Sequence, residues 1–322
     1  MSITSTDKTA RCEALIDTLA IPDPFDIHRF VAGLAQKRGR RITLIPWQPG
    51  ANHPSGMLIS TTETDYIHYP DTTSPLHSQH TVLHEIGHLL LDHNITYPDR
   101  REPAQAPDVD ALRTLLPTLS PSLIRRILGR TVYASAQERE AERFASLLLA
   151  KVTTAHDEHI RNAASEYDEG LIPLWQHMTA AVPHVQLDDT DQACVTPTPT
   201  GEYRLYRRVI EIRDAQYTLR PHVPPEIRDW ARATARERGL DPTAADILVE
   251  AAELGAALDA HRAGRRRHPE VLEALTPQHL SGPPNLIAEA RWLTQIGTAL
   301  RSNPDVAALR RRAKASTASD NR

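Results

Sequence analysis

The chain has 322 residues, 24% of them charged and 40% hydrophobic, and its formal net charge at pH 7 is −4. This composition is typical of a globular protein, and the length exceeds what one hydrophobic core usually serves, so we expect two domains. No apolar run approaches the roughly 18 residues of a membrane span, and the start of the chain lacks the charged-then-apolar pattern of a secretory signal. We therefore expect a cytoplasmic protein without a membrane span, in which the widely separated Cys12 and Cys194 are free thiols.

The first 70 residues alternate between helical and strand patterns. Apolar residues recur at helical spacing over residues 7–20, and again from Asp23-Pro24 to the stop signal Lys37-Arg38-Gly39. Three short strands follow, which we expect to form a small antiparallel sheet: Arg41–Trp47, Gly56–Thr61 and Tyr66–Tyr69. An edge strand can hold an extended peptide through main-chain hydrogen bonds. We nominate residues 56–60 for that role, with an ordinary sheet edge as the alternative.

The stretch His84-Glu85-Ile86-Gly87-His88 follows the strands and matches the H-E-x-x-H zinc signature. Ser74-Pro75 offers an N-cap and a proline at the first helical position, so we expect a helix that continues to Asp92. Residues four apart share a helix face, which lets both histidines reach one tetrahedral ion. Glu85 is turned about 100° away and suits a general base. The alternative is an amphipathic helix that matches the pattern by accident. Gly87 lowers helix propensity, which predicts close approach by another backbone or by substrate.

A catalytic zinc ion needs a third protein ligand, and the helical pattern of Ser135–Leu149 offers three carboxylates. These are Glu138, Glu140 and Glu142. Spacing alone does not choose among them, and Glu138 also fits a capping box with Ser135. His80 and His93 are nearby, but a third histidine ligand is expected ten positions after His84, where Asn94 stands. We therefore interpret His80 and His93 as neighbours of the ligands or surface residues.

The two stretches together resemble the ImmA/IrrE family of bacterial metallopeptidases, which carries HE-x-GH followed by E-x-E-A-x-x-F-A-x-x-L-L. The chain departs from the family's usual pattern at Glu142, where asparagine is common, and at Leu149-Ala150, where Met-Pro is common. The resemblance implies that Glu138 is the third zinc ligand. It also implies a zincin-like fold with a small antiparallel sheet, and a protein substrate, often a DNA-binding repressor that is cut at one site.

The chain between and after the two motifs is helical with polar interruptions. We expect a loop over 94–108 and short helices over 108–116 and 121–128, an insert that is either a lid or a solvated excursion. Further helices are predicted at 157–168 and 171–182, which completes a metallopeptidase domain over residues 1–184. A Thr- and Pro-rich linker follows at 185–202, then an all-helical domain over 203–312 and a disordered tail over 313–322. The predicted helices of the second domain are 203–218, 225–239, 243–264 and 284–302.

The second domain carries no metal-ligand or nucleophile spacing. Residues 203–310 resemble an uncharacterised helical domain found in certain bacterial transporter proteins, a resemblance that implies a fold and no chemistry. Two arginine runs, at 265–267 and 310–312, are typical of solvated helix ends, and we expect no direct nucleic-acid binding.

The sequence thus predicts an α+β protein, a zincin-like domain followed by an all-α domain, that acts as a zinc-dependent endopeptidase. Zn²⁺ would be held by His84, His88 and Glu138, with Glu85 as the general base. The donor that stabilises the oxyanion is not identified, and the candidates are His80, His93 and Tyr133. The alternative is a regulatory protein-binding module whose peptidase-like domain is inactive or conditionally active. The sequence does not indicate the oligomeric state.

Overall fold

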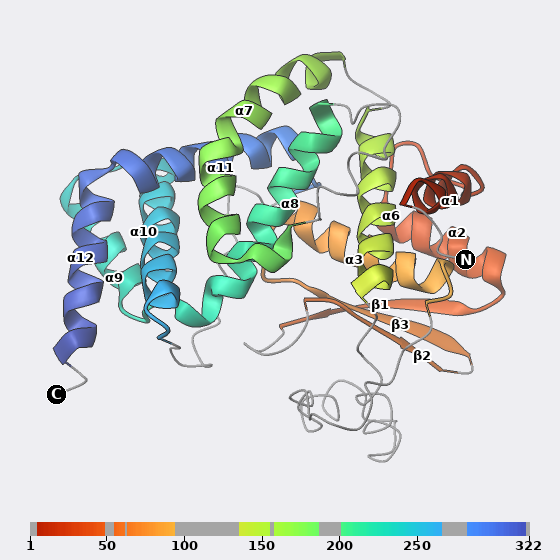
Figure 1. The fold of residues 1–322 in the computed structure, drawn as a ribbon, viewed down its shortest axis with the longest axis horizontal. Coiled ribbons are helices and arrows are strands. Elements are labelled where there is room, and N and C mark those ends of the chain that lie inside the picture. The colour runs from red at the N-terminus through yellow and green to blue at the C-terminus, as the bar shows by residue number, and fades with distance from the viewer. Residues whose placement is uncertain are drawn as a thin grey trace. The chain divides into compact units, whose positions relative to one another are not determined.

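A computed structural model describes residues 5–48, 55–61, 63–93, 135–154, 158–186, 201–265 and 282–319. Within these residues the protein is mostly helical, with one small sheet (Figure 1). The chain divides into two compact units, and each is described by itself. The first unit comprises residues 1–70 and 79–149, and the second comprises residues 71–78 and 150–322. None of the described helices is long and apolar enough to cross a membrane.

The first unit begins with two helices, α1 (Ser5–Asp17) and α2 (Ile27–Arg38). The Asp26 carboxylate accepts a hydrogen bond from the Arg29 amide at 2.7 Å, which satisfies one of the unpaired donors at the start of α2. Gly39 ends the helix in the left-handed conformation with a φ of 65°, which glycine adopts without the steric cost that a Cβ would impose. The stop signal predicted at Gly39 is therefore confirmed.

The sheet contains β1 (Arg41–Trp47), β2 (Met57–Ser60) and β3 (Thr64–Pro70) in the order β1-β3-β2. β2 pairs antiparallel with β3, but β1 pairs parallel with β3, so the prediction of an antiparallel sheet was wrong and the sheet is mixed. In a three-stranded meander β1 and β3 also run in the same direction and β2 in the opposite one, but β2 lies in the centre, whereas here β3 does. β3 takes the centre because most of its residues are buried, whereas β1 is largely exposed or half-buried.

The zinc motif lies on α3 (Pro75–Leu90), and the three candidate carboxylates lie on α6 (Ser135–Thr154). Apolar side chains of both helices, including Leu83, Ile86, Phe144 and Leu148, are fully buried in the core of the first unit. Figure 1 shows α3 beside the sheet, with α6 crossing close to it. The two helices are thus the rigid elements that carry the candidate site.

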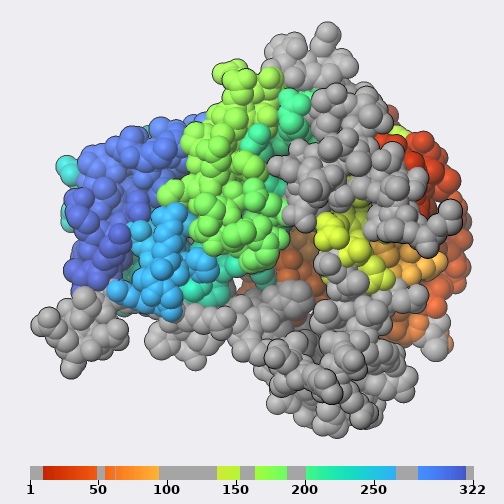
Figure 2. All heavy atoms as spheres, in the orientation of Figure 1, coloured from red at the N-terminus to blue at the C-terminus, as the bar shows by residue number. Residues whose placement is uncertain are grey.

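The second unit contains six long helices in its described part. They are α7 (Glu158–Ala181), α8 (Gly201–Leu219), α9 (Ile227–Glu237), α10 (Pro242–Arg262), α11 (Leu286–Ser302) and α12 (Pro304–Ser319), with short 3₁₀ turns η1 (Pro183–Val185) and η3 (Arg220–His222). α10 packs against α9, α11 and α12, and α7 packs against α8 and α11. In the space-filling view, side chains close the spaces between α7, α10, α11 and α12 (Figure 2).

The structure of the second unit differs from three of the predictions. α7 continues through Pro173 as one helix instead of two, with Leu171 and Leu174 buried on either side of the proline. α7 also groups with the helices that follow it, whereas the predicted boundary at residue 184 placed it in the first domain. Finally, α12 extends through most of the segment 313–322, for which we predicted disorder, because Ala313 is buried there and Lys314 pairs with Asp259. The predicted linker lies mostly outside the described residues, and the insert predicted at 94–128 lies entirely outside them.

A buried ion-pair network ties three helices of the second unit together. The Arg213 guanidinium of α8 lies 3.0 Å from Glu250 of α10 and 2.6 Å from Glu289 of α11. The three side chains are at most 9% exposed. Trp292 of α11 donates its indole N–H to the second oxygen of Glu250 at 2.6 Å, so both carboxylate oxygens have partners.

Candidate metal centre

Three side chains of the first unit converge as a metal ligand set would. His84 and His88 occupy one face of α3, and Glu138 reaches them from the first turn of α6. The His84 Nε2 and His88 Nε2 atoms are 3.0 Å apart, and the Glu138 Oε2 atom is 3.2 Å from the first and 3.6 Å from the second. Donors bound to one tetrahedral zinc ion at about 2.0–2.1 Å are roughly 3.3–3.4 Å apart. The three separations fit one zinc ion.

Gly87 permits the close crossing of α3 and α6 that brings these donors together. A Cβ atom at position 87 would lie 3.1 Å from the Ala141 Cα and 3.2 Å from the Ala141 carbonyl oxygen. Such short approaches to backbone atoms cannot be relieved by a side-chain rotation. The predicted approach of another backbone at Gly87 is confirmed, and α6 provides that backbone.

The three carboxylates of α6 point in different directions. Glu138 and Glu142 are four residues apart and share the face toward α3, as helix geometry requires. Glu140 turns away, and its carboxylate lies 3.2 Å from the Arg11 guanidinium and 3.5 Å from His93 Nε2. Glu138 therefore meets the geometric requirement for a third ligand with both motif histidines, and Glu140 does not.

The remaining ring nitrogens of the two motif histidines also have partners. His84 Nδ1 lies 3.1 Å from Glu142 Oε2, and His88 Nδ1 lies 3.0 Å from His93 Nδ1. In zinc sites, a hydrogen bond to the second nitrogen fixes the ring orientation of a ligating histidine. Glu142 and His93 are placed to orient His84 and His88.

His80, His84 and Glu142 form a second group of metal-ligand type. The two groups share His84, which faces Glu138 through Nε2 and Glu142 through Nδ1, and His80 lies outside the H-E-x-x-H motif. One carboxylate oxygen that accepts two N–H groups explains this arrangement without a metal. The structure thus places His80 and His93 beside the candidate ligands. Tyr133, the third candidate for oxyanion stabilisation, lies outside the described residues.

Glu85 is buried next to the candidate ligands and against the edge strand β2. It is 5% exposed, and its Oε2 atom has no hydrogen-bond partner among the described residues. The Leu58 amide of β2 donates a hydrogen bond to the carboxylate, and a Cβ at Gly56 would come within 2.6 Å of Oε1. Burial raises the pKa of Glu85 to about 7, against the opposing effect of the nearby His84. A carboxyl group with this pKa can both accept and return a proton near neutral pH.

The protonation states around the site suit metal binding, with one exception. Burial tends to raise the pKa of Glu138, but hydrogen bonds with His84 and His88 lower it to about 2, so the carboxylate is ionised. Burial lowers the pKa of His88 to about 4, so this ring is neutral. Burial also disfavours the charged form of His84, yet hydrogen bonds to Glu138 and Glu142 hold its pKa well above the ordinary value. In the metal-free protein His84 is therefore protonated, and its positive charge balances the neighbouring carboxylates.

Zinc binding should consequently release at least about one proton per chain at pH 7, because His84 must be neutral to ligate and the zinc charge also disfavours the protonated form of Glu85. We expect the apparent zinc affinity to rise with pH until His84 is deprotonated in the metal-free protein. Calorimetric titration with zinc in buffers of different ionisation enthalpy measures the released protons. A binding enthalpy that does not depend on the buffer would contradict this assignment of the His84 proton.

Cys12 of α1 is fully buried, burial raises the pKa of its thiol to about 12, and it belongs to neither of the two groups of metal-ligand type among the described residues. It is a free thiol, as the sequence predicted, and Cys194 lies outside the described residues. The described part of the second unit contains no cluster of metal-ligand type, so the candidate site belongs to the first unit alone.

Comparison with known proteins bears on the second unit only. Residues 158–302 match a family of unknown function (DUF6545). The match covers less than half of the chain, begins with α7 and ends with α11, which agrees with the grouping of α7 with the later helices. No curated protein and no solved structure matches the chain.

Proposed function

We propose that the protein is a zinc-dependent endopeptidase that acts on a protein substrate. The observation that carries the proposal is the convergence of the His84, His88 and Glu138 donor atoms at separations of 3.0, 3.2 and 3.6 Å. The buried carboxylate of Glu85 lies directly beside them, on the residue after the first ligand. Three protein ligands leave a fourth position for water, which distinguishes a catalytic site from a closed structural one.

Zinc bound to these ligands would lower the pKa of a coordinated water molecule to about 7 and polarise the scissile carbonyl. Glu85 accepts the proton of the attacking water and returns it to the leaving amine. Glu85 is placed for both transfers because its buried carboxylate adjoins the three converging donors. Glu142 and His93 keep the ligand rings in place through the nitrogens that face away from the metal.

The position of the edge strand β2 is a second observation that favours a peptide substrate. Among the described strands, β2 pairs only with β3, so one of its edges is unpaired within the sheet. The Leu58 amide on this strand donates to Glu85, so the strand and the carboxylate adjoin. An extended peptide that pairs with β2 would pass Glu85, and main-chain pairing would hold it whatever its side chains. A DNA-binding repressor, the substrate class that the family resemblance implies, is the first candidate to test.

The proposal predicts that proteolysis depends on zinc. A cell extract is incubated with the protein as purified, with protein stripped by a chelator, and with stripped protein resupplied with zinc. New protein N-termini are then identified by mass spectrometry. We expect a small set of new N-termini in the first and third incubations and their loss in the second. Cleavage that persists after metal removal, or no new N-terminus in the zinc-loaded sample, would refute the proposal.

A further inference from the structure

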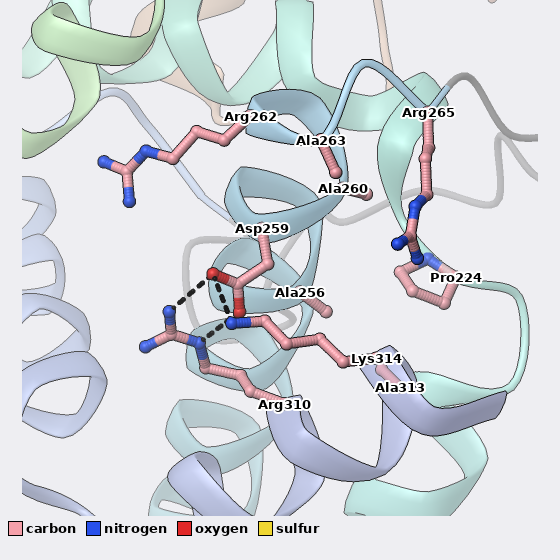
Figure 3. A pocket seen from close by; sticks show the side chains of 10 residues that line it. All are labelled: Pro224, Ala256, Asp259, Ala260, Arg262, Ala263, Arg265, Arg310, Ala313 and Lys314. Atoms are coloured by element: carbon pink, nitrogen blue, oxygen red, sulfur yellow. Dashed lines mark hydrogen bonds and ion pairs between the residues drawn. The ribbon is translucent and has the colours of Figure 1, made fainter. Parts of the chain in front are cut away.

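A pocket of about 430 Å³ opens in the second unit between the C-terminal half of α10, α12 and the turn before α9. Alanine side chains of α10 and α12 form much of its lining, together with the Pro224 ring. Figure 3 shows Arg310 and Lys314 converging on Asp259 and Arg265 near Pro224, whereas the Arg262 side chain points away from Asp259, with its Nη2 atom 3.4 Å from His177 Nε2. Four cationic side chains and one carboxylate leave a surplus of three positive charges.

Asp259 does not oppose an anionic ligand, because two cations already neutralise it. Arg310 binds it in a bidentate manner, with both N···O distances at 2.9 Å, and the Lys314 ammonium lies 3.2 Å away. Burial tends to raise the pKa of Asp259, but Arg310 and Lys314 lower it below its ordinary value. Asp259 therefore stays ionised and serves to position two cations at the pocket.

Gly255 allows Arg310 to take this position. A Cβ atom at residue 255 would come within 2.6 Å of the Arg310 Cδ and 3.0 Å of its Nε. Glycine in the middle of a helix costs about 1 kcal/mol relative to alanine, so its presence in α10 calls for a packing reason. Arg310 and Leu300, whose Cδ1 atom would lie 2.8 Å from the same Cβ, together supply that reason, and the absence of a side chain at 255 lets Arg310 cross α10 toward the pocket.

We propose that this pocket binds the phosphate group of a small soluble phosphate ester. A phosphomonoester carries a charge of about −1.5 to −2 and three acceptor oxygens, which matches a surplus of three positive charges better than a single carboxylate does. Arginine side chains bind phosphate oxygens in bidentate geometry, and lysine adds a point charge. The volume lies within the range of roughly 300–1,000 Å³ that is usual for small-ligand sites, and the alanine lining accommodates a compact apolar body.

The test is a calorimetric titration of the full-length protein with inorganic phosphate, at about 0.15 M ionic strength so that diffuse attraction is screened. The double variant Arg262→Gln/Arg265→Gln removes two exposed cations without touching the Asp259 ion pair. Arg236→Gln, an exposed arginine of α9 outside the pocket, is the matched control. Acetate is titrated in parallel as a carboxylate. All three substitutions lie in the second unit and leave the candidate zinc ligands unchanged.

We expect saturable binding of one phosphate per chain, weakened by at least about tenfold in the double variant and unchanged in the control. Acetate should bind at least about tenfold more weakly than phosphate. Binding that does not saturate, or that the control weakens as much as the double variant, would overturn the proposal. Acetate binding as tight as phosphate binding would overturn the assignment to phosphate. These outcomes do not depend on whether the first unit binds zinc.

Discussion

Replacing Glu85 with glutamine should abolish proteolysis while leaving the metal in place. The amide has nearly the same shape as the carboxyl group but cannot accept the proton of the attacking water. General-base catalysis contributes about 10²–10⁴-fold to a rate, so we expect the rate of appearance of new N-termini to fall by about a thousandfold. The zinc content should equal that of the parent, because Glu85 is not among the three converging ligands.

Glu63→Gln is the matched control, since its carboxylate is 81% exposed and pairs only loosely with Arg41, at 3.7 Å. We expect this variant to cleave at the parental rate. A Glu85→Gln protein that binds zinc and cleaves as fast as the parent would remove the general base from the mechanism. If Glu85→Gln bound a protein partner normally but neither it nor the parent cleaved that partner, the regulatory binding module would be the better account.

Replacing Arg213 with methionine should strongly destabilise the second unit. The substitution leaves Glu250 and Glu289 buried without the cation that now lies within 3.0 Å of each. Breaking a buried ion pair by removing one partner costs about 3–5 kcal/mol, because the remaining charge is left uncompensated. We expect the free energy of unfolding to fall by about that amount, with little change in the dependence on urea concentration.

Urea unfolding can be followed by the fluorescence of Trp175, Trp230 and Trp292, which all lie in the second unit, in a Trp47→Phe background that silences the first. Arg238→Met is the control, because its ion pair with Asp305 involves an arginine side chain that is 62% exposed. An exposed pair contributes about 0–1 kcal/mol. Equal losses for the two variants would show that the Arg213 network is no more important than a surface pair.

Local sequence patterns were sufficient to predict most helices and the positions of the strands. The N-cap of α2 at Asp26, its end at Gly39 and the start of α3 at Pro75 each depend on a few adjacent residues. The order of the strands was not predictable in the same way. Each strand pattern identifies a strand, but which strand is central depends on how much of it the rest of the fold buries, and β3 is buried more than β1.

Sequence spacing alone could not choose which of the three carboxylates of α6 faces the two histidines. Glu138, Glu140 and Glu142 differ only in their angle around the helix, and the direction of α3 was unknown. The close approach of Gly87 to Ala141 sets the crossing of the two helices, and this turns Glu138 and Glu142 toward the histidines and Glu140 toward Arg11. Gly87 was the one signal in the sequence that pointed to this crossing.

The orienting roles of Glu142 and His93 were only partly predictable. Glu142 stood out as a departure from the family pattern, but no spacing rule linked it to His84 Nδ1. The pocket of the second unit was also missed, because its cations come from the end of α10, from Arg265 just after it and from α12, and α10 and α12 are separated by more than forty residues in the chain. Such clusters form only when distant helices pack, and periodicity within one helix does not reveal them.

The most direct test of the zinc centre is elemental analysis of purified parent protein beside Glu138→Ala and Glu140→Ala. The account predicts about one zinc per chain in the parent and in Glu140→Ala, and a loss of zinc in Glu138→Ala, because among the described carboxylates Glu138 alone lies within 3.6 Å of both histidine Nε2 atoms. Absence of zinc from the parent, even after zinc is supplied, or loss of zinc in Glu140→Ala with retention in Glu138→Ala, would contradict it.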